Sequence, residues 1–237
     1  MTKLLPEQPM NHAREFRPAP PPAPTSTTEL MLVRHGQGQC NAAGIIGGRA
    51  GCQGLSDLGR RQSRALADRI AGLHADRPFD LVLCTPRLRV RQCAQTIATR
   101  LSRPVVVVEN LRGQDFGTAD GRSWQQVTAA FGGPPWHDPD RPIAPGAETW
   151  NDYAARVLAA LHTVLEVHAG RRILLVAHGK TIGLTGALLS GAAEPAQAAC
   201  RFVIDHGALS HWQQAPGGWA MLVENASEHL APRVDAP

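Results

Sequence analysis

Two apolar segments, each ending in His-Gly, constrain the fold of this chain more than any other feature of its sequence. Residues 29–36 read ELMLVRHG, and residues 171–179 read RRILLVAHG. Continuous apolar runs of this length, bounded by polar loops, are typical of strands that are buried on both faces. In an open α/β sheet, ligands bind beyond the carboxyl ends of the strands. We therefore expect His35 and His178 to face one crevice, provided that their strands are neighbours.

The rest of the chain alternates between helical and extended patterns. This alternation predicts an α/β fold, with three αβα layers and a mostly parallel central sheet. Ser56 and Thr149 are expected to cap helices, and Thr85 followed by Pro86 predicts a third helix start. The expected helices cover residues 56–73, 86–101, 149–168 and 179–189, and the expected strands cover 79–85, 104–109 and two or three segments within 201–225.

The chain has 237 residues, of which 43% are hydrophobic, so it is long enough for one substantial core. Residues 1–28 include the proline-rich run RPAPPPAP and are expected to form a solvated tail rather than a docking peptide. Residues 29–237 are expected to form a single domain. The segments within 109–148 are expected to form its lid, and Trp124 and Trp136 either line the pocket there or only pack.

Composition narrows the classes of protein that the chain can belong to. No run approaches the roughly 18 apolar residues that a membrane span needs, and the N-terminus lacks the pattern of a signal peptide. The five cysteines form no CxxC pair and no metal-ligand spacing, which favours reduced thiols in a cytoplasmic protein without a metal. Aromatic residues make up 5% and do not interleave with basic runs, which argues against nucleic-acid binding.

Five motifs follow one another in a characteristic order. They read LVRHGQGQCN with LSDLGRRQ, TPRLRVRQCAQTIA, PGAETW with Arg156 downstream, LLVAHGKTI, and the tail NASEHL. In this order they resemble the histidine phosphatase superfamily, in the branch that contains phosphoglycerate mutases and α-ribazole phosphatases. The resemblance covers about residues 29–230 and implies a phosphoglycerate mutase-like fold. It also implies a hydrolase that acts on a small phosphorylated metabolite, with no cofactor and no membrane partner; a homodimer is compatible with it. Departures from the family pattern at Gln37, Gly38, Cys52 and Gly54 indicate a specialised substrate and a place in specialised metabolism.

The resemblance also implies a role for each motif residue. His35 would attack phosphorus and become a phosphohistidine, which divides one transfer into two easier steps. Arg34, Arg89 and His178 would surround the phosphoryl group and neutralise its charge, so that no metal is needed. Smaller contributions to substrate or phosphate binding are expected from Gly36, Gln37, Asn41, Thr85 and Gly179.

Two further arginines flank Arg89 in the second motif. We expect Arg87 and Arg91 to face solvent, as outward residues of a helix. We expect Gly36 to let the backbone pass close to the ligand, because glycine has no side chain.

One departure from the family pattern changes the expected chemistry. The segment LRGQDFGTADG at 111–121 carries Gly113 where the family has a glutamate that protonates the leaving oxygen. Losing a general acid typically costs about 10²–10⁴-fold in rate. Asp115 and Asp120 are the candidates to replace it, and Glu109 is a weaker one. Alternatively, the substrate has a leaving group that departs unprotonated, such as an acyl phosphate, an enol phosphate or a diphosphate.

Other functions stay open at this point. The chain lacks the Arg-His-Tyr-Gly segment with which mutases of this branch close over their intermediate, which argues against a mutase. A catalytically weak anion-binding module would not need the nucleophile, so retention of His35 argues against that alternative. A lyase or isomerase on the same pocket is a further alternative.

Overall fold

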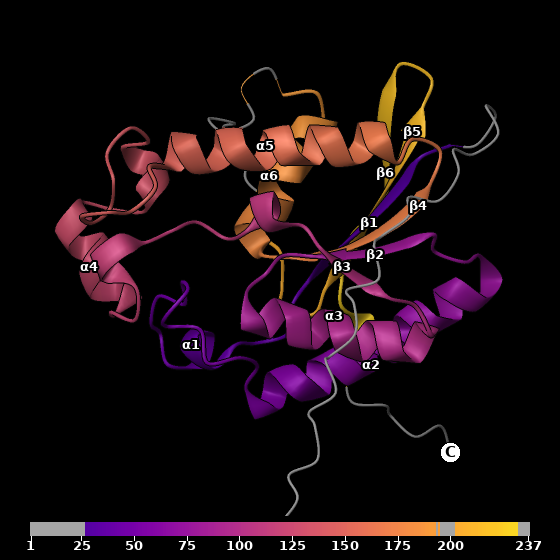
Figure 1. Cartoon of the computed structure of the whole chain (residues 1–237), viewed down its shortest axis with the longest axis horizontal. Coiled ribbons are helices and arrows are strands. Elements are labelled where there is room, and N and C mark those ends of the chain that lie inside the picture. The colour runs from indigo at the N-terminus through magenta and orange to yellow at the C-terminus, as the bar shows by residue number, and fades with distance from the viewer. Residues whose placement is uncertain (1–26, 193, 195–201, 232–237) are drawn as a thin grey trace, which may run out of the picture.

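The computed structural model describes residues 27–192, 194 and 202–231 and centres on a six-stranded sheet (Figure 1). The strands lie in the order β3-β2-β4-β1-β5-β6. Their bounds are β1 Glu29–Arg34, β2 Leu81–Cys84, β3 Val105–Val107, β4 Arg172–Ala177, β5 Leu209–Ala215 and β6 Gly218–Ala226. The helices are α1 Gln39–Ala42, α2 Asp57–Asp76, α3 Leu88–Leu101, α4 Trp124–Phe131, α5 Trp150–Val167 and α6 Gly179–Leu189.

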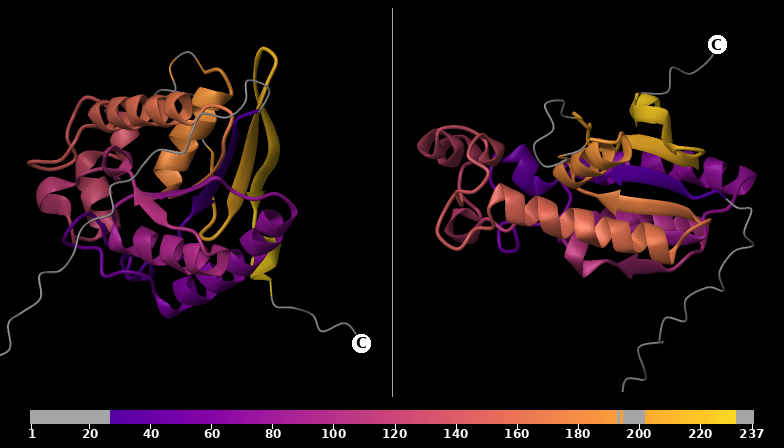
Figure 2. Two further views of the ribbon diagram at one scale, coloured as in Figure 1. Left: turned by 45° about the vertical axis from the view of Figure 1, so that its right-hand side comes forward. Right: turned by 90° about the horizontal axis from the view of Figure 1, so that it is seen from above.

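Parallel pairing at the centre of the sheet brings the two His-Gly segments together. β1 pairs with β4 in parallel, in a register that sets Arg34 opposite Ala177. Each histidine follows immediately after its strand, so His35 and His178 leave the same edge of the sheet side by side. β2 and β3 are also parallel, whereas β5 and β6 form an antiparallel hairpin at one edge (Figure 2). The predicted α/β fold with a mostly parallel sheet is confirmed.

Helices cover both faces of the sheet. On one face, α5 and α6 pack against alternate residues of β1 and β4, including Leu30, Leu32 and Leu175. On the other face, α2 and α3 cover the intervening residues, including Met31 and Val33 (Figure 1). Because successive side chains of a strand point to opposite faces, each strand contributes residues to two separate apolar clusters. Burial on both faces explains why these strands read as unbroken apolar runs.

Two predicted helix starts are confirmed, and one is wrong. The hydroxyls of Ser56 and Thr149 accept hydrogen bonds from the amides three residues on, as N-caps do. The helix predicted from Pro86 begins instead at Leu88, with Arg87 as its N-cap. Thr85 is not a cap, because its hydroxyl contacts the ring of His178.

Thr28 belongs to the fold, although the sequence predicts it to be the last residue of the tail. Thr28 is buried, and its hydroxyl accepts a hydrogen bond of 2.8 Å from the Gly170 amide. The expected tail therefore ends before Thr28; the remainder of that prediction, residues 1–26, lies outside the described residues.

A separate group of short elements connects β3 to α5. It consists of α4 and the 3-10 turns η1 Glu109–Leu111, η2 Gly117–Ala119 and η3 Pro135–His137. α4 and its neighbours project beyond one end of the sheet (Figure 1). This is the region that the sequence predicts to be the lid. Within the described ranges, no helix is long and apolar enough to cross a membrane.

Two glycines of α2 provide a test of how this helix packs. A Cβ on Gly59 would lie 1.9 Å from the Gln37 carbonyl oxygen, whereas one on Gly72 would meet nothing within 4 Å. We expect Gly59→Ala to lower the free energy of unfolding by about 1–3 kcal/mol, because backbone must move. Gly72→Ala should raise it by about 0.5–1 kcal/mol, because alanine favours the helix. Urea unfolding of both variants measures this; equal effects would contradict the described packing.

Candidate active site

His35 is buried, and its ring orientation is fixed at both nitrogens. Nδ1 donates to the Gly36 carbonyl at 2.7 Å, which leaves Nε2 unprotonated. Nε2 accepts from Arg89 Nε at 3.1 Å. Burial, followed by the charge of Arg89 and the neighbouring His178, holds the pKa of His35 well below its usual value. A neutral imidazole with a lone pair on Nε2 is the form that can act as a nucleophile.

Gly36 is required for packing against α2. A Cβ at this position would lie 2.4 Å from the Gly59 carbonyl oxygen at the start of α2. Gly36 does not line the cavity described below, and neither does Gln37, whose side-chain oxygen accepts from the Ser56 hydroxyl at 2.8 Å. The absence of a side chain at Gly36 thus makes room for α2, and its expected approach to the ligand stays a prediction.

His178 occupies the equivalent position at the end of β4. Its ring centre lies 5.4 Å from that of His35. Arg89 Nη2 donates to its Nδ1 at 3.3 Å, so its Nε2 donates to the Thr85 hydroxyl at 3.0 Å. Burial and then the charges of Arg89 and Arg87 hold the pKa of His178 well below its ordinary value. The expected convergence of the two histidines is thus observed, and Thr85 orients one of them.

Three arginines surround these histidines. Arg34, Arg87 and Arg89 line the same cavity, and the Nε atoms of Arg34 and Arg87 are buried without a hydrogen-bond partner among the described residues. Burial and the charge of Arg89 lower the pKa of Arg34 to about 10. Buried, underused guanidinium donors are a strong indication of an anion site, because phosphate supplies the missing acceptors.

Arg87 corrects an expectation from the sequence. We expected both Arg87 and Arg91 to face solvent; Arg91 does, but Arg87 is buried in the cavity wall. The reason is the later start of α3, which leaves Arg87 in extended backbone before the helix. Its side chain is therefore not confined to the outer face of α3.

His206 is a site residue that sequence reasoning missed. Arg34 Nη2 donates to His206 Nε2 at 2.9 Å, and the ring lies 5.7 Å from that of His35. Burial and then the charges of Arg34 and Arg89 lower the pKa of His206 to about 4. A neutral acceptor here fixes the Arg34 guanidinium. The only signal in the sequence was a third His-Gly pair, at 206–207, just before the expected strand.

A cavity of about 570 Å³ opens from these residues toward the lid. Asn41, Gly113 and Gly179 line it, as do both lid tryptophans. No aspartate or glutamate lines it within the described part of the chain. Its outer walls are apolar and aromatic, formed by Ile45, Ile46, Phe116, Trp124, Trp136, Trp150, Tyr153, Leu184 and Phe202.

The structure does not bring the candidate acids into this cavity. The Asp120 carboxylate accepts from the amides of Gly48, Ala50 and Gly51 at 2.7, 2.7 and 3.0 Å, so it anchors that loop. Asp115 is exposed and accepts from the Gly117 amide at 3.1 Å. Both remain candidates only on sequence grounds, and the geometry favours a site without a carboxylic acid.

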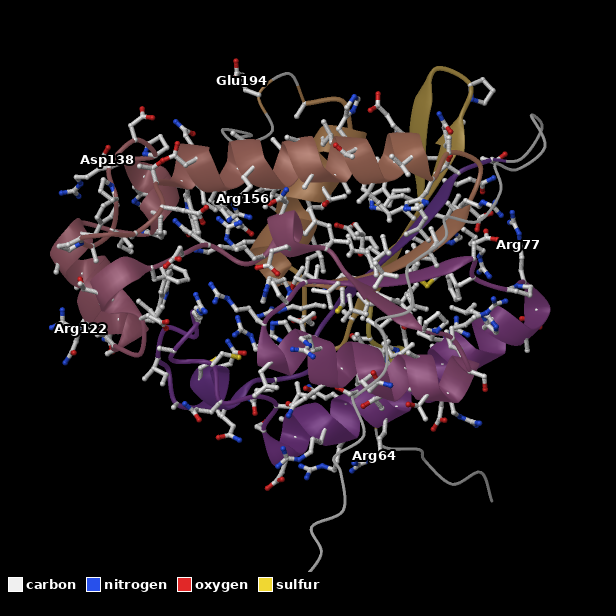
Figure 3. All side chains as sticks on the ribbon, in the orientation of Figure 1. Arg64, Arg77, Arg122, Asp138, Arg156 and Glu194 are labelled. Atoms are coloured by element: carbon white, nitrogen blue, oxygen red, sulfur yellow. The ribbon has the colours of Figure 1, made fainter. Side chains whose placement is uncertain are left out.

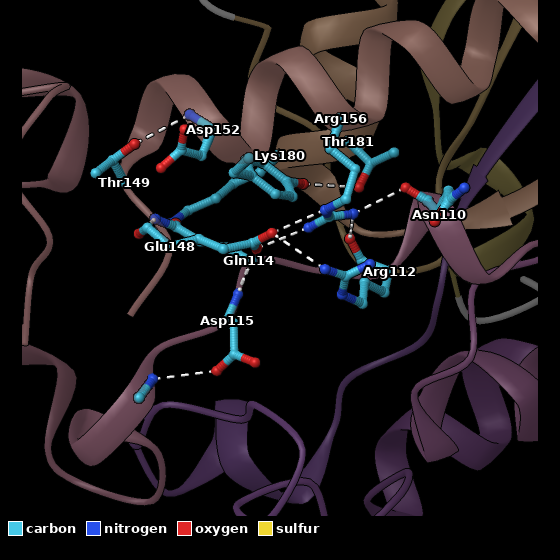
Figure 4. Close-up of polar contacts among 12 residues, drawn as sticks. Asn110, Arg112, Gln114, Asp115, Glu148, Thr149, Asp152, Arg156, Lys180 and Thr181 are labelled. Atoms are coloured by element: carbon cyan, nitrogen blue, oxygen red, sulfur yellow. Dashed lines mark hydrogen bonds and ion pairs between the residues drawn. The ribbon is translucent and has the colours of Figure 1, made fainter. Parts of the chain in front are cut away.

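An ion pair holds the wall that carries Gly113 (Figure 4). Glu148 accepts two bonds from Arg156, at 2.8 and 2.7 Å, and Arg156 donates to the carbonyls of Asn110 and Arg112. Burial disfavours the Glu148 carboxylate, but bonds from Arg156 and the Asp115 amide outweigh it, so its pKa is lowered. This pairing explains the PGAETW motif and its downstream arginine: both partners position the 110–115 segment.

The fold and this site together define an α/β protein in which buried arginines, suited to binding an anion, surround a neutral histidine. Comparison with known proteins identifies the family. The model of the histidine phosphatase superfamily (branch 1) matches residues 30–227, so the chain belongs to that superfamily and is a phosphatase of the histidine type, as the sequence predicts.

Individual relatives span nearly the whole chain. Phosphatase PhoE of Bacillus subtilis is 27% identical over 86% of this chain and 97% of its own length. The probable phosphoglycerate mutase GpmB of Klebsiella pneumoniae is 30% identical over 87% of this chain and 97% of its own. The crystal structure of the α-ribazole phosphatase of Shigella flexneri aligns with a TM-score of 0.70, at 26% identity, over 84% of this chain and 96% of that one.

Arg87 and Arg91 form a matched pair for testing the anion site, since both are arginines near the start of α3. We expect Arg87→Met to weaken the binding of inorganic phosphate by about 10–100-fold, the value of a hydrogen bond to a charged group. Arg91→Met removes the same charge from an exposed position and should change the affinity little. Isothermal titration calorimetry measures both; equal losses would show that overall charge, rather than the cavity, governs binding.

Proposed function

We propose that this chain hydrolyses the phosphate ester of a small metabolite through a phosphohistidine at His35. The observation that carries this proposal is the grouping of His35 Nε2, Arg34, Arg87 and Arg89 around one cavity, whose described lining contains no carboxylate. The names of PhoE and the α-ribazole phosphatase support hydrolysis as the outcome. Cationic side chains supply the charge that a metal provides in other phosphatases.

The proposed reaction has two steps. The lone pair of His35 Nε2 attacks phosphorus in line while the bond to the leaving oxygen breaks and that oxygen takes the electron pair. Water then attacks the phosphohistidine, the P–N bond breaks, and phosphate leaves with His35 again neutral. The arginines neutralise charge on the equatorial oxygens in both steps, and Arg89 already lies against Nε2.

Proton supply distinguishes this enzyme from its relatives. A Cβ on Gly113 would lie 3.0 Å from His178 Nε2, so a glutamate at this position would reach the phosphate site. The described residues that line the cavity offer no carboxyl group in its place. We therefore propose that the substrate carries a weakly basic leaving oxygen, as in an acyl, enol or aryl phosphate or a diphosphate.

Gly113→Glu tests the missing acid directly. Wild type should hydrolyse acyl and aryl phosphates about 10²–10⁴-fold faster than alkyl phosphates of similar size, because alkoxides need a proton to depart. Gly113→Glu should narrow that gap by raising the rate on alkyl esters. Rates of phosphate release from acyl, aryl and alkyl phosphates, measured for wild type and for Gly113→Glu, give the rate ratio in each protein.

The matched control for this experiment is Gly113→Gln, which has the same bulk against His178 without an acidic proton. Equal effects of Glu and Gln would attribute the change to bulk. If wild type hydrolyses alkyl and aryl esters equally fast, the leaving-group proposal is wrong.

The wider setting of the enzyme is proposed on weaker grounds. All four cysteines of the described residues are buried free thiols, which supports the cytoplasmic location predicted from the sequence. A homodimer and a role in specialised metabolism remain predictions. Transfer of the phosphoryl group back to substrate, as in a mutase, would appear as isomerised ester in place of free phosphate.

A further inference from the structure

Lys180 places an ammonium group on the lid side of the cavity. It is the second residue of α6 and lines the cavity two positions after His178. Its Nζ donates to Gln114 Oε1 at 3.0 Å (Figure 4). Four aromatic rings surround Nζ, with centres at 5.0 Å for Phe116, 4.9 Å for Trp124, 5.4 Å for Trp136 and 5.8 Å for Trp150.

This position is unfavourable for a lysine in three ways. The side chain is half-buried, and burial lowers the pKa of Lys180 to about 7. The first turn of a helix carries a partial positive charge that repels a cation. Finally, no carboxylate of the described residues lies within salt-bridge distance of Nζ or lines the cavity. Cation–π contacts and Gln114 offset part of this cost, but among the described residues Gln114 alone accepts a hydrogen bond from the three N–H donors of the ammonium.

An anionic group on the substrate would reverse each of these effects. It would accept the remaining donors, neutralise the charge and restore the pKa of Lys180 toward its usual value. Lys180 is the single cation at the lid end of the described cavity lining, whereas the three arginines gather around His35. One cation suits a carboxylate better than a second phosphate dianion. The aromatic rings around Nζ and the apolar walls of the cavity suit a flat, apolar body next to that carboxylate.

We propose that Lys180 is a specificity-determining residue that binds a carboxylate on the leaving group. The substrate class is then the phosphate ester of an aromatic or unsaturated carboxylic acid. The phosphoryl group lies among the arginines and the acid reaches the lid. This inference rests on the proposed function for the phosphoryl end only; recognition of the carboxylate does not require turnover.

The charged groups that face Lys180 set the expected pH dependence. They are His178 beside it, which stays neutral, and the cations Arg34, Arg87 and Arg89 that line the same cavity. Glu148 is paired with Arg156 and Arg112. Because the pKa of Lys180 is lowered to about 7 in the free enzyme, preference for a carboxylate should be greatest below pH 7 and decline above it.

Two non-hydrolysable ligands test the proposal without relying on catalysis. 4-Carboxybenzylphosphonate carries the second anion, and 4-carboxamidobenzylphosphonate is its neutral isostere. We expect wild type at pH 6.5 to bind the carboxylate at least about tenfold more tightly, since a hydrogen bond to a charged group contributes that much. In Lys180→Met the ratio should fall to about one, and in wild type it should fall as the pH rises from 6.5 to 8.5. Calorimetry gives every affinity.

Arg122→Met is the charge-matched control. Arg122 is exposed on the outer side of the lid, away from the cavity lining (Figure 3), so its loss should leave the ratio unchanged. A ratio near one in wild type, or a ratio that survives Lys180→Met, would overturn the proposal. Should Lys180→Met fail to fold, the pH dependence in wild type decides. If neither phosphonate binds, the phosphate site itself fails, and the proposal for Lys180 falls with it.

Discussion

Parallel pairing of β1 with β4 is the constraint on which the site depends. The register that sets Arg34 opposite Ala177 places the residues after each strand beside one another, so His35 and His178 share one edge of the sheet. Parallel strands buried on both faces need helices on either side, and these helices close the site: α3 follows Arg87, and α6 begins immediately after His178. The burial of the two strands and the position of the polar residues at their ends therefore depend on the same packing of helices against the sheet.

Positive charge dominates the lining of the cavity. Arginines crowd around two histidines, and the described lining contains no carboxylate. An isolated imidazole is protonated, and so loses its lone pair, at a pH below its usual pKa. The surrounding positive charge and burial lower the pKa of His35, so that its imidazole stays neutral and keeps the lone pair that a nucleophile needs. The same arginines favour the binding of an anion, because the buried Nε atoms of Arg34 and Arg87 lack hydrogen-bond acceptors among the described residues. Lys180 adds a fourth cation to this lining, among the aromatic rings of the lid.

Much of the fold and the convergence of His35 and His178 could be predicted from sequence, because local patterns encode them. Apolar runs give strands, and hydroxyl caps give helix starts at Ser56 and Thr149. Other features depend on long-range contacts that no local pattern carries. Arg87 enters the cavity because α3 starts two residues later than Pro86 suggests. His206 reaches Arg34 across 172 positions of sequence. Lys180 stood in a motif, but its aromatic surroundings come from the lid.

The central claim is that His35 carries the phosphoryl group, and trapping it is the most direct test. Wild type would be mixed with an aryl phosphate, quenched within the first turnover under alkaline conditions, and digested for mass spectrometry. We predict one phosphoryl group on the peptide that contains His35, lost on acid treatment, as expected of a phosphoramidate. The label should be absent from His35→Ala, which should also release no phosphate. Phosphate release by wild type with no labelled His35 peptide, or by His35→Ala at an undiminished rate, would contradict this account.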